Sequence, residues 1–191
     1  MSRIAVFVSG NGTHLPWLLE EFDVVAVVCN NPRAPALEKT EMVHTLCLDH
    51  KDYSTREAWE EVVHAFLLER KVELIVLAGF MRILTASFVR KWPLKIVNVH
   101  PALLPAFPGA HAIQDALNYG AKITGCTVHF VDEGVDTGPI LAQGSTPVLP
   151  EDTVDSLKKR IGFMERSHLR SVLWWVTDGR FSVEGRRVLF T

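Results

Sequence analysis

The segment Arg3–Thr13, RIAVFVSGNGT, carries the clearest indication of the fold class. Its first part, Arg3–Ser9, is a near-continuous run of β-branched and apolar side chains, which is typical of a strand covered on both faces. Gly10-Asn11-Gly12 breaks this run, and the pattern that follows predicts a helix from about Thr13 to Glu21. A buried strand that leads directly into a helix indicates parallel strands joined by helical crossovers.

The same alternation continues through the first half of the chain. Further buried strands are predicted at Val24–Cys29, Val43–Leu48, Leu74–Ala78 and Leu94–Val99, and helices at Ser54–Arg70 and Ala86–Lys91. Ser54 and Glu57 have the spacing of a capping box at the start of the longer helix. Its predicted apolar stripe includes Ala58, Val62, Phe66 and Leu67. We therefore expect an α/β protein with an open, doubly wound, mostly parallel sheet and helices on both faces, a Rossmann-like fold.

The second half has a different pattern. Helices are predicted at Ala110–Tyr119 and from about Thr153 to Val176, strands at Thr124–Val131 and Ile140–Val148, and a terminal hairpin that turns at Glu184-Gly185. With no repeat or linker, residues 1–191 are expected to form a single domain with two halves, 1–100 and 101–191. Ligands bind such sheets outside the carboxyl ends of the strands. That rule points to Ser9–Thr13, Ala78–Arg82 and Asn98–Pro108.

Composition excludes several classes of function. The formal net charge of −2 and a charged fraction of 22% do not indicate a partner such as nucleic acid or an anionic membrane. Cys29, Cys47 and Cys126 each lie in an apolar run without a CxxC pair, as expected for buried thiols in a reducing compartment. The N-terminus lacks the pattern of a signal peptide, and no apolar stretch reaches membrane-spanning length. We expect a cytoplasmic protein.

The turn at Gly10–Thr13 is a candidate anion site. Glycine leaves backbone N–H groups uncovered at the start of a helix, where they can bind phosphate, and the Thr13 hydroxyl adds a donor. The turn matches neither GxGxxG nor GxxxxGK[ST], so it indicates neither a dinucleotide nor a nucleoside triphosphate. An ordinary strand-to-helix turn is the competing interpretation.

Asn98 and His100 end a predicted strand and point to the same face, because they are two residues apart. An amide beside an imidazole can polarise a carbonyl and carry a proton. The prolines at 101, 105 and 108 stiffen the loop that follows. The competing interpretation is an asparagine that caps the loop and a buried structural histidine.

Asp136 lies in a loop with glycines on both sides, Asp132–Pro139, where the backbone can approach a ligand closely. Its carboxylate could orient His100 or relay a proton through water, or the loop could be a self-capped acidic turn. The spacing does not match a calcium-binding EF-hand loop. His100, His129 and Asp136 lack the spacing of a zinc site, and GxSxG is absent, so we expect no metal and no covalent nucleophile.

Five segments together resemble a known family. They are VSGNGT (8–13), LAGFMRIL (77–84), NVHPALLPAFPG (98–109), GCTVHFVDEGVDTGPILAQ (125–143) and DGRFSVEGRRV (178–188). In this order they resemble the phosphoribosylglycinamide formyltransferases, a branch of the folate-dependent formyltransferase superfamily, over essentially the whole chain. The resemblance implies transfer of a formyl group from 10-formyltetrahydrofolate to the amine of 5'-phosphoribosylglycinamide, in de novo purine biosynthesis.

The resemblance also implies roles for individual residues. Asn98, His100 and Asp136 match the catalytic residues, with His129 in support, and Glu165 matches a contact to the amine substrate. The substrate phosphate would bind at Gly10, Asn11, Gly12, Thr13 and His14. Folate would contact Arg56, Met81, Arg82, Ile83, Leu84 and Val135. The first half of the chain would thus bind the acceptor phosphate, and the second half would contribute to folate binding. A cis peptide bond is implied at Leu104-Pro105.

The chain departs from the family pattern at three places. His14 stands where the family commonly has Asn, Ala102 replaces the Ser of HPSLLP, and the segment Leu15–Val24 is shorter. We expect these changes to affect substrate affinity more than the reaction. The partners are expected to be small molecules, without nucleic acid or membrane, and the oligomeric state, including a homodimer, stays open.

The expected chemistry is direct attack of the amine on the formyl carbon, with Asn98 and protonated His100 stabilising the oxyanion. Three alternatives stay open. A formyl-folate hydrolase would use the same trio with water, but usually carries an extra N-terminal domain. A methionyl-tRNA or amino-sugar formyltransferase would need C-terminal modules. From a different class, a non-catalytic nucleotide-binding protein would not turn over.

Overall fold

The β-branched run Ile4–Val8 forms strand β1 of the computed structural model, which describes every residue from Met1 to Thr191. Three further strands run parallel with it: β2 (Val24–Cys29), β3 (His44–Cys47) and β4 (Leu74–Leu77). Their order is β3-β2-β1-β4, with Ile4 paired to both Val24 and Leu74. All five residues of β1 are buried, as the sequence predicts for a strand covered on both faces.

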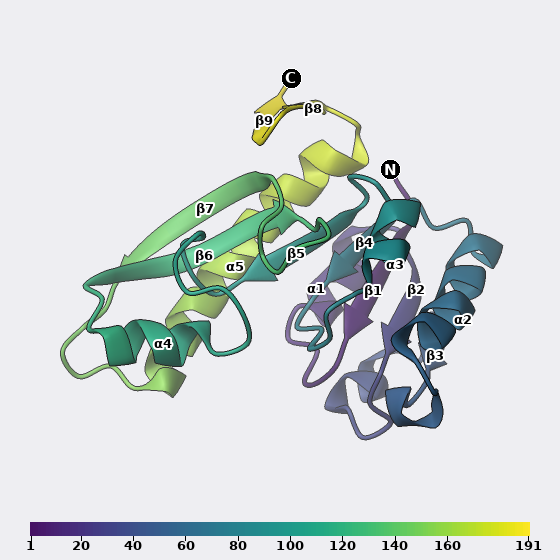
Figure 1. Cartoon of the computed structure of the whole chain (residues 1–191), viewed down its shortest axis with the longest axis horizontal. Helices are drawn as coiled ribbons and strands as arrows, with labels where there is room; N and C mark the ends of the chain where they lie inside the picture. The colour runs from purple at the N-terminus through teal and green to yellow at the C-terminus, as the bar shows by residue number, and fades with distance from the viewer. The chain divides into compact units, whose positions relative to one another are not determined.

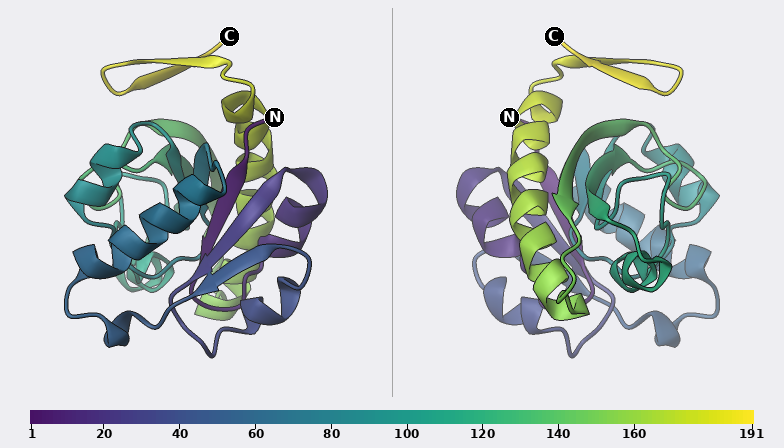
Figure 2. Two further views of the ribbon diagram at one scale, coloured as in Figure 1. Left: turned by 90° about the vertical axis from the view of Figure 1, so that its right-hand side faces the viewer. Right: turned by 90° about the vertical axis from the view of Figure 1, so that its left-hand side faces the viewer.

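Helices cover both faces of these parallel strands. The order of the strands means that the connection from β1 to β2, through α1 (Leu15–Glu21), runs one way along the sheet. The connection from β3 to β4, through α2 (Arg56–Glu69), runs the opposite way. Because both crossovers are right-handed, α1 and α2 lie on opposite faces (Figure 2). A short helix α3 (Ala86–Lys91) follows β4, and two 3-10 helices, η1 (Pro35–Lys39) and η2 (His50–Asp52), flank β3.

Three local predictions for this region differ from the structure. Helix α1 begins at Leu15 instead of Thr13, and its N-cap His14 makes no side-chain capping bond. Helix α2 is capped by Thr55, whose hydroxyl accepts from the Ala58 N–H, and not by a box of Ser54 and Glu57. Its buried residues are Trp59, Glu60, Val63 and Leu67, so the core-facing stripe is rotated from the one predicted.

The second part of the chain combines a long antiparallel pair with one long helix. Strands β6 (Ile123–Phe130) and β7 (Ile140–Pro147) pair from Ile123–Pro147 onward, and α5 (Val154–Thr177) packs along both (Figure 1). Leu157 and Ile161 of α5 form a buried cluster with Cys126 of β6 and with Ile113 of α4 (Ala112–Tyr119). The chain ends in the predicted hairpin, β8 (Phe181–Glu184) and β9 (Arg187–Phe190).

The chain folds into two compact units, Met1–Val97 and Asn98–Thr191. The boundary falls within β5 (Ile96–His100), whose last three residues belong to the second unit. The peptide bond Leu104-Pro105 is cis, which confirms that prediction. None of the helices combines the length and the apolar character needed to span a membrane.

Candidate active site

His100 is the last residue of β5 and is almost fully buried. Its Nε2 lies 2.8 Å from the Phe107 carbonyl oxygen, which can only accept a hydrogen bond, so this nitrogen carries a proton. The other nitrogen, Nδ1, lies 3.4 Å from Oδ2 of Asp136. Both nitrogens therefore face hydrogen-bond acceptors, which fix the orientation of the ring.

Asp136 reaches this position from the loop between β6 and β7. It adopts a left-handed backbone conformation, with φ at 55°, which is uncommon outside glycine and is frequent at functional sites. The Gly109 N–H donates to its Oδ2 at 2.8 Å. Burial alone would raise the pKa of this carboxyl, but the His129 side chain, the Gly109 N–H and the His100 charge together lower the pKa to about 2. Asp136 is thus held as an anion.

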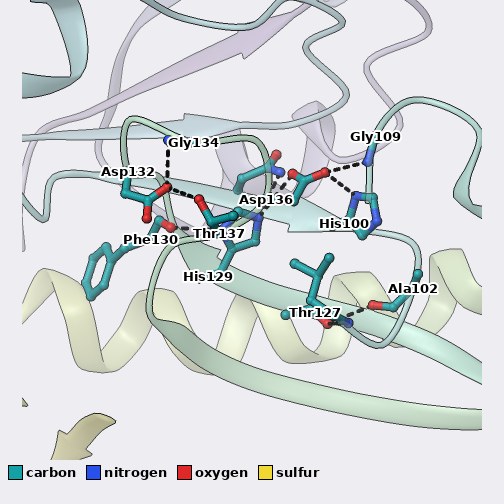
Figure 3. A network of polar contacts seen from close by, with 12 residues as sticks. His100, Ala102, Gly109, Thr127, His129, Phe130, Asp132, Gly134, Asp136 and Thr137 are labelled. Carbon is teal, nitrogen blue, oxygen red and sulfur yellow. Dashed lines mark hydrogen bonds and ion pairs between the residues drawn. The ribbon is translucent and has the colours of Figure 1, made fainter. Parts of the chain in front are cut away.

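His129 of β6 lies beside Asp136 in the same group of side chains (Figure 3), and it also contacts Asn98. Its Nδ1 donates to the Phe130 carbonyl oxygen at 2.8 Å, and its Nε2 lies 3.2 Å from the Asn98 amide nitrogen and 3.6 Å from Oδ1 of Asp136. The polar side chains singled out in the sequence thus meet in one network, in which His129 links Asn98 to Asp136.

The loop that carries Asp136 is shaped by contacts among its own residues. Asp132 accepts a bond from the Gly134 N–H at 3.1 Å and another from the Thr137 hydroxyl at 2.6 Å. A Cβ at Gly138 would lie 1.8 Å from the Phe130 carbonyl oxygen, so this glycine is required for the close return of the chain to β6. Val135, one of the predicted folate contacts, is exposed on this loop.

The buried hydroxyl of Thr127 fixes the loop that follows His100, and sequence reasoning missed it. Thr127 donates to the Ala102 carbonyl oxygen at 2.7 Å and accepts from the Leu104 N–H and the Gln143 amide, both at 3.0 Å (Figure 3). Gln143 also donates to the Leu104 carbonyl oxygen at 2.9 Å. The polar residues Thr127 and Gln143, in apolar-patterned strands, were the signal that could have revealed this clamp.

In the first unit, hydrogen bonds hold the backbone carbonyl groups of the glycine turn Gly10–Gly12. The Gly10 oxygen accepts from the Ala36 N–H at 3.1 Å, and Lys39 of η1 donates to the Asn11 oxygen at 2.6 Å. Gly12 has φ at 57°, and a Cβ there would lie 2.7 Å from the Cβ of Ala36. Because carbonyl and N–H point in opposite directions across a trans peptide, the Gly12 N–H is turned away from Lys39. Thr13 is exposed beside it.

His14 differs from the other residues predicted to bind phosphate, because its side chain is buried. Its Nδ1 accepts a bond from Trp17 Nε1 at 3.4 Å, and the two rings meet edge to face. The His14 ring therefore packs against α1, and its Nδ1 is occupied by the Trp17 N–H.

Four of the remaining folate candidates lie in the segment after β4, and Arg56 lies at the start of α2. Met81 and Ile83 are 72% and 55% exposed, whereas Leu84 is 8% exposed and packs as a core residue. The guanidinium of Arg82 lies over the Trp59 ring at 5.6 Å. The guanidinium of Arg56 donates to the Ile83 carbonyl oxygen at 3.5 Å.

Glu165 lies near the middle of α5 and is half-buried. Its charge acts on Cys126 of β6: burial and the Glu165 carboxylate together raise the pKa of this thiol to about 11. No group of three or more His, Cys, Asp or Glu side chains is arranged to hold a metal ion.

Comparison with known proteins places this geometry in a family. The formyl transferase family model matches residues 2–173. The phosphoribosylglycinamide formyltransferase of Bacillus subtilis is 38% identical over 182 residues, which cover 91% of this chain and 93% of that protein. The trifunctional purine biosynthetic protein adenosine-3 of Drosophila melanogaster is 45% identical over 170 residues, or 83% of this chain. The chain spans only 13% of the length of that trifunctional relative.

Solved structures agree with the sequence comparison. The crystal structure of glycinamide ribonucleotide transformylase 1 from Symbiobacterium toebii superposes with a TM-score of 0.95 at 39% identity, covering 100% of this chain and 94% of that one. This similarity confirms the predicted α/β fold with a mostly parallel sheet. Since the family model and the relatives both cover most of its length, the chain belongs to the formyl transferase family.

Proposed function

We propose that this protein transfers the formyl group of 10-formyltetrahydrofolate to the amine of 5'-phosphoribosylglycinamide, a step of de novo purine biosynthesis. The observation that carries the proposal is the pair of an anionic Asp136 and a His100 whose two nitrogens both face acceptors. Such a pair places an imidazole, which can donate a hydrogen bond to a developing oxyanion, beside a carboxylate that orients it. The names of the bacterial relatives support the choice of substrates.

In the proposed mechanism the substrate amine attacks the formyl carbon and forms a tetrahedral oxyanion. Asn98 and the imidazolium of His100 stabilise the negative charge. Nε2 of His100 is engaged by the Phe107 carbonyl, so Nδ1, which also faces Oδ2 of Asp136 at 3.4 Å, would be the nitrogen that turns its proton toward the oxyanion. Asp136 holds His100 in its charged form and, through water, carries the proton of the attacking amine to N10 of the folate. The C–N10 bond then breaks, leaving a formamide and tetrahydrofolate.

The binding roles are distributed over several segments. We propose that the substrate phosphate binds the N–H groups of Gly12 and Thr13, on the side of the turn opposite Lys39. The exposed side chains of Met81, Ile83 and Val135 would contact the folate ring, with Arg56 near its carboxylates. Glu165 would bind the acceptor amine.

Acceptor dependence tests the proposal. The purified protein is mixed with 10-formyltetrahydrofolate, with and without phosphoribosylglycinamide, and both products are measured by chromatography and mass spectrometry. A formyltransferase gives one formylated acceptor for each folate consumed, and almost no consumption without acceptor. Equal consumption in both reactions would identify a hydrolase, and no consumption in either would indicate a binding protein.

A further inference from the structure

One face of helix α2 packs against the segment Phe80–Thr85. Arg56, Trp59 and Glu60 have helical spacings of three and four residues, so their side chains share this face. The Trp59 ring stacks on Phe80 with a centroid distance of 6.0 Å and lies under the Arg82 guanidinium. Arg56 donates a hydrogen bond to the Ile83 carbonyl oxygen.

Glu60 makes the strongest of these contacts. Its carboxylate is in a side chain only 4% exposed, and Oε1 accepts the Thr85 N–H at 2.9 Å while Oε2 accepts the Thr85 hydroxyl. Thr85 is in turn the N-cap of α3, accepting the Phe88 N–H at 3.3 Å. Burial raises the pKa of Glu60, and the two Thr85 donors oppose that rise. A buried carboxylate without these donors would be unfavourable, so Glu60 and Thr85 hold each other in place.

The other end of the segment is held independently. The Met81 N–H donates to the Ser9 hydroxyl at 2.8 Å, and the same hydroxyl donates to the Asn30 side chain at 2.6 Å. Between the two anchors, Met81 and Ile83 point large apolar side chains toward solvent. Without these anchors such side chains would turn inward, because the burial of apolar surface is favourable. The anchors therefore keep an apolar contact surface exposed.

We infer that Glu60 is a positioning residue for the folate co-substrate: through Thr85 it fixes the backbone that presents Met81 and Ile83. This inference rests on the proposed function, because it assumes that the presented surface binds folate. Glu60 itself does not contact the reacting groups in this account. Its effect is confined to the affinity for one of the two substrates.

The test compares Glu60→Ala with two matched variants. Glu60→Gln keeps an oxygen for the Thr85 N–H and an amide that can donate to the Thr85 hydroxyl, so it should restore the contact. Glu61→Ala removes the neighbouring carboxylate, which also joins α2 to α3 by pairing with Lys91, but at an exposed site away from the segment. Glu60→Ala should raise KM for 10-formyltetrahydrofolate about tenfold, the value of one hydrogen bond to a charged group.

In the same variant, kcat and KM for phosphoribosylglycinamide should stay within about twofold of wild type, because only ground-state folate binding is affected. Glu60→Gln and Glu61→Ala should match wild type in all three constants. A purely structural Glu60 would leave KM for folate unchanged in the folded protein, and that result would overturn the inference.

Two further measurements separate the possible failures. If Glu60→Ala does not fold, Thr85→Val and Thr85→Ser replace it: the valine variant should raise the folate KM and the serine variant should restore it. If wild type shows no formyl transfer, the proposed function is wrong. Amide hydrogen exchange then tests whether Glu60 fixes the segment. Exchange at Phe80–Thr85 should be faster in Glu60→Ala, but not in Glu60→Gln or Glu61→Ala. Unchanged exchange in Glu60→Ala would refute the positioning role.

Discussion

Oδ2 of Asp136 lies 3.4 Å from Nδ1 of His100, and one short loop holds both side chains. The Phe107 carbonyl binds Nε2 of His100, and two residues later the Gly109 N–H binds Oδ2 of Asp136. Phe107 and Gly109 both have positive φ, at 53° and 92°. The unusual backbone of this loop therefore presents a carbonyl to the His100 ring and an N–H to the Asp136 carboxylate.

Charge at position 83 should affect folate binding and leave folding intact. Ile83 is exposed whereas its neighbour Leu84 is buried. We expect Ile83→Asp to fold with a melting temperature close to that of wild type and to raise KM for folate at least about tenfold, because it places a charge on an apolar contact surface. Leu84→Asp should fail to fold. Thermal unfolding and steady-state kinetics check both, and a folded Ile83→Asp variant with unchanged folate KM would exclude this surface from folate binding.

Asp136 should contribute to stability in a pH-dependent way. Its pKa is lowered from 3.8 to about 2, so it stabilises the folded state above the unfolded-state value, and this contribution is lost as the pH falls through about 2. The shift corresponds to about 2 kcal/mol. In Asp136→Asn, whose side chain tolerates the left-handed backbone, the stability deficit relative to wild type should shrink between about pH 4 and pH 2. Chemical unfolding of both proteins across this pH range measures the stability deficit. A deficit independent of pH would mean that His129, Gly109 and His100 do not lower the pKa of Asp136 in the folded protein.

The Thr127 clamp should support both folding and catalysis. Thr127→Val keeps the shape but leaves the Leu104 N–H and the Ala102 carbonyl without their partner, which should lower the free energy of unfolding by about 2 kcal/mol. The loosened loop should also lower kcat at least about tenfold in the folded protein. Thr127→Ser, which retains the hydroxyl, serves as control. Urea unfolding and steady-state kinetics of the two variants show whether stability and kcat depend on the Thr127 hydroxyl or on its methyl group. Equal losses in Thr127→Val and Thr127→Ser would contradict a role for the hydroxyl.

Much of this fold was predictable because local patterns and core packing agree. The buried run Ile4–Val8, the short helix Ala86–Lys91 and the terminal hairpin lie where the sequence predicts them. The α2 stripe was wrong because Glu60, a charged residue that hydropathy assigns to the surface, is buried against Thr85. Sequence patterns do not show that a carboxylate will find two donors from a distant segment.

The candidate site was predictable in its side chains but not in its backbone. Asn98, His100 and Asp136 follow from strand periodicity, loop composition and family resemblance, and the structure brings them together around His129. The groups that fix them, the Phe107 carbonyl and the Gly109 N–H, carry no side-chain signal, because every residue has both. His14 is a different case: its position in the family motif implied a phosphate contact, and in the structure Trp17 donates to its Nδ1.

A double-mutant cycle on the rate of formyl transfer tests most directly whether Asp136 acts through His100. His100→Ala and Asp136→Ala should each lower kcat on the order of a hundredfold or more, with little change in substrate affinity. Because Asp136 acts through His100, the double variant should be no more than about threefold slower than the slower single variant. If instead the two losses multiply fully, Asp136 and His100 act independently, and the proposed roles of Asp136 in orienting His100 and relaying the proton are contradicted.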